Sequence, residues 1–137
     1  MRVSLDRIEH PYHMVAKNET GNTVSIDASP SIGGKGSGAR PMELLLMGLA
    51  SCSGIDVLNI LYKQRQEVNS FHVDVDGKRE EGKEANVFVQ IHVHFKLSGN
   101  IEPGKLEHAI KLSLEKYCSV AKTLEKTATI THSYTIE

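Results

Sequence analysis

The first 27 residues alternate apolar and polar side chains in short stretches. Alternation with a period of two is typical of strands that bury one face. The three stretches are Arg2–Ile8, Tyr12–Lys17 and Thr23–Asp27. A polar turn at 18–22 joins the last two, so this part of the chain predicts a small antiparallel meander.

A long helix is predicted from Met42 to about Gln64. Pro41 suits its first turn, and Glu43 complements the positive end of the helix dipole. The segment 43–58 is apolar or small on every side, whereas a surface helix would show a polar face. Because one small chain has little material to wrap such a helix, a dimer that shares this helix layer is expected.

Two further strands are predicted after the helix. Residues 71–76 and 87–97 alternate in hydrophobicity, which indicates a hairpin with one side facing the core. The connection 80–86 is charged and contains Gly82, as expected of an exposed hairpin tip.

The C-terminal third predicts two helices and a last strand. After Pro103, apolar residues recur at helical spacing until Cys118 interrupts the pattern. A shorter helical segment, Ser119–Lys126, follows, and the alternating segment Thr127–Ile136 predicts the last strand. The order β-β-β-α-β-β-α-α-β predicts an α+β fold, with antiparallel sheets around a buried central helix, in a single domain over 1–137.

Composition narrows the classes of protein. The net charge is -1 and 24% of the 137 residues are charged, so a nucleic acid is not an expected partner. No apolar run follows the first residues, Met1–Glu9, and a cytoplasmic protein is expected. Leu44–Ala50 is the longest strongly apolar run, far below the roughly 18 residues of a membrane span, so no membrane insertion is expected.

Two cysteines, Cys52 and Cys118, are the candidate reactive groups. Their wide separation does not match a zinc ribbon or a disulfide scaffold. Cys52 lies about 16 Å along the helix from Pro41, beyond the reach of the helix dipole. Cys118 is predicted at a break between helices, where free N–H groups favour a thiolate. Local electrostatics therefore favour Cys118 as nucleophile, and the alternative is that both cysteines are small core residues.

Two other groups of residues resemble ligand sites but are better explained by structural roles. His92 and His94 share a strand face that His72 could join, and three imidazoles can bind zinc. The strict alternation makes them the polar face of the hairpin instead, so no metal is predicted. The glycine-rich loop 33–38 lacks the GxxxxGK[ST] spacing of a phosphate cradle and is predicted to be a flexible lid or entry loop. No GxSxG hydrolase elbow is present.

Two segments resemble known cysteine motifs. RPMELLLMGLASCSGIDV at 40–57 and YCSVAKTL at 117–124 are similar to the two motifs of the OsmC/Ohr family, osmotically inducible protein C and organic hydroperoxide resistance protein. With the order of strands and helices, the resemblance covers essentially the whole chain. It is closest to the less characterised OsmC-like branch.

The resemblance implies a swapped homodimer with two sites at the subunit interface and no metal or organic cofactor. Cys52 would attack an organic hydroperoxide and become a sulfenic acid, and Cys118 would resolve that acid as a disulfide, which an external dithiol reduces. These roles, with Cys52 as nucleophile, replace the assignment of Cys118 as nucleophile that local electrostatics favour. The alternative function is a non-catalytic dimer that binds a small hydrophobic ligand and has structural cysteines.

The resemblance also draws attention to Arg40 and Glu43. A nearby cation is the expected means of stabilising a mid-helix thiolate, and Arg40 ends the mobile loop. In better-known branches an arginine pairs with a glutamate directly after the helix-starting proline. Here Met42 holds that position, and Glu43 lies about 100° further round the helix. We expect Glu43 to point away from the thiol, which predicts a slower and less selective peroxidase.

Overall fold

The computed structural model describes all 137 residues, which form two compact units, 1–45 and 46–137. The first unit contains the predicted meander. Its sheet has the order β1-β2-β3 and both pairings are antiparallel. The strands are β1 (Val3–Glu9), β2 (His13–Asn18) and β3 (Thr23–Ile26). The prediction that 1–137 form a single domain stays a prediction.

The loop that follows β3 is organised by the Asp27 carboxylate. Its Oδ2 accepts the backbone N–H groups of Lys35 at 3.0 Å and Ser37 at 3.1 Å. A side chain at Gly34 would collide with the Ala28 carbonyl, so glycine is required where the loop folds back on itself. These contacts argue against the flexible lid that the glycine content predicts.

The second unit is a three-stranded sheet with helices on one face. The helix α1 (Pro41–Lys63) begins in the first unit and continues into the second. The sheet order is β4-β5-β6. Its strands are β4 (Glu67–Arg79), β5 (Phe88–Asn100) and β6 (Thr129–Ile136).

The prediction of purely antiparallel sheets is wrong at one pairing. β4 and β5 are antiparallel, as a hairpin requires, but β6 runs parallel to β5. Parallel neighbours need a crossover of a dozen or more residues. The segment 101–128 supplies it, because its helices carry the chain back to the end of the sheet where β5 began.

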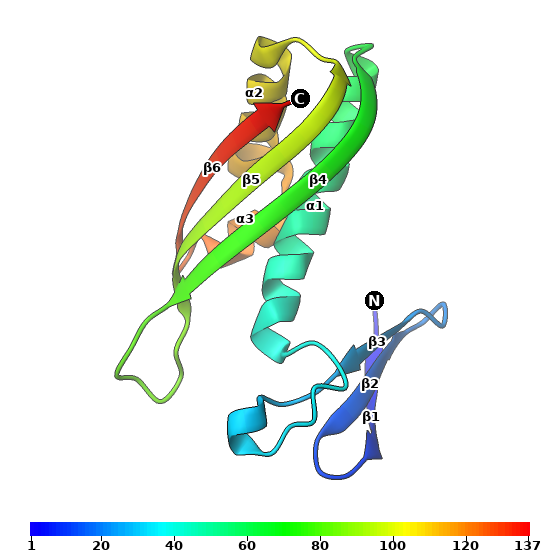
Figure 1. Cartoon of the computed structure of the whole chain (residues 1–137), viewed down its shortest axis with the longest axis vertical. Helices are drawn as coiled ribbons and strands as arrows, with labels where there is room; N and C mark the ends of the chain where they lie inside the picture. The colour runs from blue at the N-terminus through cyan, green and yellow to red at the C-terminus, as the bar shows by residue number, and fades with distance from the viewer. The chain divides into compact units, whose positions relative to one another are not determined.

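The crossover contains α2 (Pro103–Leu112), a π-helical turn (Ser113–Tyr117) and α3 (Ser119–Leu124). Figure 1 shows α1, α2 and α3 on the same face of the sheet. The core lies between these two layers. Its fully buried apolar side chains include Leu49, Val57, Leu61, Ile91, Val93, Phe95, Leu97, Leu106 and Ile110.

One chain buries only one side of α1. Gly54 brings the helix against the sheet, where an added Cβ would lie 3.1 Å from the Phe71 ring. On the other side Met47 is 51% exposed, Ile55 68% and Tyr62 59%. The all-round burial that the sequence predicts is therefore not achieved within a single chain.

By length and composition alone, α1 would be able to cross a membrane. It has 23 residues and a mean hydropathy of 1.8 over its most apolar window. The core helix of a soluble protein passes the same test, and α1 packs against a sheet through Leu49, Val57 and Leu61. The predicted lack of membrane insertion stays a prediction.

Candidate active site

The structure brings Cys52 and Cys118 together. Their sulfur atoms and a carboxylate oxygen of Asp56 all lie within 4.8 Å of one another. Cys52 is half-buried on α1, whereas Cys118 is fully buried. The two thiols therefore lie near each other, as the family resemblance implies, and their individual roles stay predictions.

The position of Cys118 follows from the break between two helices. Its backbone N–H donates to the Ser113 carbonyl at 2.7 Å, which closes the wide π-helical turn. Its own conformation is extended, and its Sγ accepts the Ala121 N–H at 3.3 Å as the N-cap of α3. The helix break predicted at this residue is confirmed.

Burial affects the pKa of the Cys118 thiol more than its position at the start of α3 does. Desolvation, with a smaller contribution from Cys52 as a hydrogen-bond partner and neighbouring charge, raises the pKa of the Cys118 thiol to about 11. The N–H groups of Ala121 and Val120 lower this pKa but do not offset burial. The raised pKa argues against Cys118 as the thiolate nucleophile, the role that local electrostatics favoured without considering desolvation.

Asp56 is the site residue that the sequence analysis missed. It follows Cys52 by one helical turn, so both side chains lie on the same side of α1. The buried Ser113 hydroxyl donates to Asp56 Oδ2 at 3.0 Å. The sequence contains one indication of its importance, because Asp56 is the only charged residue between Glu43 and Lys63.

Glu43 has a structural role at the start of α1. Its Oε1 accepts the backbone N–H of Arg40 at 2.8 Å, which is half of a capping box. Arg40 and Glu43 both belong to the first compact unit, whereas the cysteines belong to the second. An effect of either residue on Cys52 therefore stays a prediction.

The three histidines of the hairpin lie on the sheet face opposite the helices. Both ring nitrogens of His92 are hydrogen-bonded, at 2.7 Å each, to the hydroxyls of Thr131 and Ser133 on β6. His94 also bonds Ser133, and His72 pairs with Asp74 at 3.0 Å. These bonds support the interpretation of a polar sheet face.

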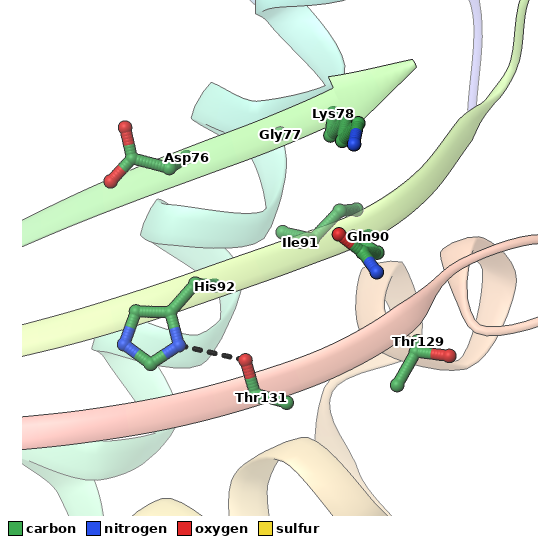
Figure 2. Close-up of a pocket in the computed structure, with 8 residues that line it drawn as sticks. All are labelled: Asp76, Gly77, Lys78, Gln90, Ile91, His92, Thr129 and Thr131. Carbon is green, nitrogen blue, oxygen red and sulfur yellow. Dashed lines mark hydrogen bonds between the residues drawn. The ribbon is translucent and has the colours of Figure 1, made fainter. Parts of the chain in front are cut away.

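A pocket of about 470 Å³ opens on this outer face, around His92. Figure 2 shows its lining side chains from all three strands, most of them polar, and none of them is a cysteine. The lining residues are Asp76, Gly77, Lys78, Gln90, Ile91, His92, Thr129 and Thr131. This pocket is separate from the paired thiols.

The cysteine site has the donors for thiol chemistry and for a soft metal ion. Two thiols and one carboxylate within 4.8 Å of one another could hold an ion such as Zn²⁺. The prediction of no metal and no organic cofactor therefore stays a prediction.

The model of the family described as OsmC-like protein matches residues 34–133. This range includes both cysteines and Asp56. The chain belongs to the OsmC-like family. Its relative Protein YhfA of Escherichia coli strain K12 is 43% identical over 97 residues, which are 70% of this chain and 72% of that protein.

Solved structures share the OsmC-like fold over nearly the whole chain. A hypothetical protein from Aquifex aeolicus VF5 is 34% identical, with a TM-score of 0.81 over 99% of this chain and 96% of its own. An organic hydroperoxide resistance protein OsmC from Legionella pneumophila is 13% identical, with a TM-score of 0.73 over 98% and 97%. The second likeness shows the fold alone.

Proposed function

We propose that this OsmC-like protein reduces organic hydroperoxides through a cycle between Cys52, Cys118 and their disulfide. The observation that carries the proposal is a pair of thiols within 4.8 Å of each other that differ in exposure. A structural pair of core cysteines would not need one accessible member. The name of the Legionella neighbour supports the substrate class.

Cys52 is the proposed attacking thiol. As a thiolate, its sulfur attacks one oxygen of the hydroperoxide, the O–O bond breaks, and the other oxygen leaves as an alcohol after taking a proton. Cys52 becomes a sulfenic acid. The helix around it is rich in apolar and small residues, which favours an organic hydroperoxide over a strongly hydrated one.

Cys118 is the proposed resolving thiol. Its sulfur attacks the sulfenic sulfur of Cys52, the S–O bond breaks, and water leaves. A disulfide has an S–S length of about 2.05 Å, so a short approach of the two side chains completes the bond. An external dithiol then reduces the disulfide by exchange. We place this cycle in the cytoplasm, where such reductants keep thiols reduced.

A second copy of the chain is the proposed cover for the outer side of α1. Met47, Ile55 and Tyr62 are exposed and fall along one side of the helix. Light scattering at micromolar concentration is expected to give twice the 15.1 kDa of one chain. Ile55→Asp should weaken the dimer, whereas Lys83→Asp at the hairpin tip should not. A wild-type monomer would contradict the proposal.

The decisive experiment measures peroxide consumption by the reduced protein with a dithiol present. Cumene hydroperoxide should be consumed over many turnovers, and free thiols should fall by two per chain when the dithiol is left out. The alternative function, binding of a small hydrophobic ligand at the exposed side of α1, predicts neither change. Unaltered thiols after excess peroxide would contradict the peroxidase.

A further inference from the structure

Asp56 is the only acidic side chain placed among the paired thiols. One of its carboxylate oxygens is within 4.8 Å of both sulfur atoms. Its Oδ2 accepts the Ser113 hydroxyl, whereas its Oδ1 accepts no hydrogen bond from another group of the chain. Asp56 therefore has one anchored oxygen and one oxygen free to accept or donate a proton.

The resolving step of the proposed cycle needs a proton to change place. The Cys118 thiol must lose its proton before its sulfur attacks. The oxygen on Cys52 must gain a proton, because hydroxide is a poor leaving group and water is a good one. The two events occur on neighbouring sulfur atoms, so one carboxylate within reach of both could serve each of them.

We propose that Asp56 takes the proton from the Cys118 thiol and gives it to the departing oxygen of the Cys52 sulfenic acid. This inference rests on the proposed peroxidase cycle. The S–S bond forms as the S–O bond breaks, Cys118 is oxidised, Cys52 is reduced, and one water leaves. The carboxylate ends the step in its starting form, so no further oxidant, reductant or acid is required.

Ser113 connects the proton carrier to the thiol that it serves. Its hydroxyl holds Asp56, and its carbonyl accepts the Cys118 N–H at 2.7 Å. Both bonds come from one fully buried residue at the start of the π-helical turn. Ser113 is a positioning residue, because it fixes the carboxylate of α1 relative to the backbone of Cys118.

The Cys118 thiol is a weak acid, so the resolving step needs a proton acceptor. Burial raises its pKa to about 11, so at neutral pH the resolving thiol is almost entirely protonated. A general acid or base in hydrogen-bond reach, or one water away, typically contributes about 10²–10⁴ in rate. The spacing of up to 4.8 Å between the carboxylate and the sulfur atoms suits transfer directly or through one water.

Other titratable groups near the crossover are engaged elsewhere. On the inner side of β6, His132 pairs with Glu107 of α2 at 3.0 Å and holds the pKa of that carboxyl below its usual range. Lys111 also pairs with Glu107. On α3, Lys122 pairs with Glu125. The remaining charged or titratable residues of the π-helical turn are exposed at its surface: Glu115, Lys116 and Tyr117.

The test separates the two chemical steps in the intact protein. Reduced protein is mixed with one equivalent of cumene hydroperoxide and quenched at intervals. Dimedone labelling reports the Cys52 sulfenic acid, and mass spectrometry of alkylated samples reports the disulfide. The variants are Asp56→Asn and Asp56→Glu, with Asp76→Asn on the outer sheet face as the matched control.

In Asp56→Asn, disulfide formation is expected to slow about a hundredfold, the lower end of the usual range for a lost acid or base. Sulfenic acid formation should be unchanged or slightly faster, because a negative charge beside Cys52 has been removed. Between pH 6 and 9 the slow resolving step should gain about tenfold per pH unit as Cys118 ionises, whereas the wild type should change little. Asp56→Glu should restore part of the rate.

A purely structural Asp56 would give a different pattern. Disulfide formation within threefold of wild type in Asp56→Asn, or the same pH slope in both proteins, would overturn the inference. Equal slowing of both steps would also overturn it. If wild-type Cys52 forms no sulfenic acid, the peroxidase itself has failed, and the two failures are thereby distinguished.

A second assay removes the peroxide altogether. The aromatic disulfide DTNB reacts with the accessible Cys52, which forms a mixed disulfide and releases one coloured thiolate, and attack by Cys118 on the Cys52 sulfur then releases a second coloured thiolate, whose rate is followed. The release should also slow about a hundredfold in Asp56→Asn, because the Cys118 proton must still be removed. Ser113→Ala, which loses the anchor of Asp56, should show a smaller decrease. Unchanged release in Asp56→Asn would overturn the role of Asp56 as proton acceptor.

Discussion

Asp27 and Asp56 are both fixed by hydrogen bonds, but their surroundings differ. Asp27 accepts the backbone N–H groups of Ala28, Lys35 and Ser37, which occupy both of its oxygens. Asp56 accepts one hydroxyl and lies among thiols. A carboxylate with every oxygen occupied by backbone donors holds a loop in shape. One with a free oxygen beside reactive groups can exchange a proton.

The largest loss of activity is expected from replacing the two cysteines beside Asp56. Cys52→Ser should reduce peroxide consumption to background, because no other thiol is accessible. Cys118→Ser should permit one sulfenic acid per chain and then stop without a resolving thiol. Peroxide assays with dithiol and dimedone labelling measure both results. Ser51→Ala, next to Cys52 on α1, is the control, and wild-type turnover in Cys52→Ser would remove the basis of the comparison.

The next effect concerns the acidity of the thiol beside Asp56. Because the pKa of Cys118 is about 11 and its ordinary value is 9.0, its alkylation at neutral pH should be about a hundredfold slower than that of an ordinary thiol. In Cys52→Ser, the pKa of Cys118 should fall, since two of the effects that raise it are gone, but burial should keep it above 9.0. The pH dependence of alkylation, followed by mass spectrometry, measures it. An ordinary pKa would show that the site is more hydrated than the structure indicates.

Asp27 should influence the loop and leave the thiols unaffected. In Asp27→Asn, the amide protons of Lys35 and Ser37 should exchange about tenfold faster, because their acceptor is weakened. The rates of both peroxidase steps should not change. Hydrogen exchange followed by NMR tests the first point, and Asp6→Asn on β1 is the control. Undisturbed loop amides would show that the glycine-rich backbone holds the loop without the carboxylate.

Acid should weaken the same loop in a predictable direction. The N–H group of Ser37, with those of Ala28 and Lys35, lowers the pKa of Asp27, although burial opposes this. The resulting stabilisation is complete above the pKa of the carboxyl in the unfolded chain and is lost as the pH falls through the lower folded value. The difference between wild type and Asp27→Asn should therefore be present at pH 7 and disappear in strong acid. Thermal unfolding across this range measures it.

The smallest effects are expected at the start of α1. Glu43→Ala removes the acceptor of the Arg40 N–H and should cost about 0.5 kcal/mol of stability, with little change in Cys52 alkylation. Arg40→Ala should slow Cys52 alkylation, because the Arg40 guanidinium is the expected stabiliser of the Cys52 thiolate. The opposite ordering would show that Glu43 organises the site in addition to capping the helix.

Sequence patterns were reliable wherever the local period decided the structure. The alternation in Phe88–Asn100 and the helix break at Cys118 were both predicted, because each depends on neighbouring residues. The direction of β6 was not, since alternation is the same in parallel and antiparallel strands. Asp56 was missed because its contact with Ser113 joins segments that are distant in sequence. The acidity of Cys118 was misjudged because desolvation depends on the whole fold.

The π-helical turn determines the direction in which the second cysteine faces. A π turn is a regular helix with one extra residue accommodated in its backbone. A chain with regular helix across Ser113–Tyr117 would rotate the following side chain by about 100° around the axis. The proximity of the two thiols thus depends on the one extra residue in this turn. Inserting or deleting a residue there would test this dependence more directly than any substitution.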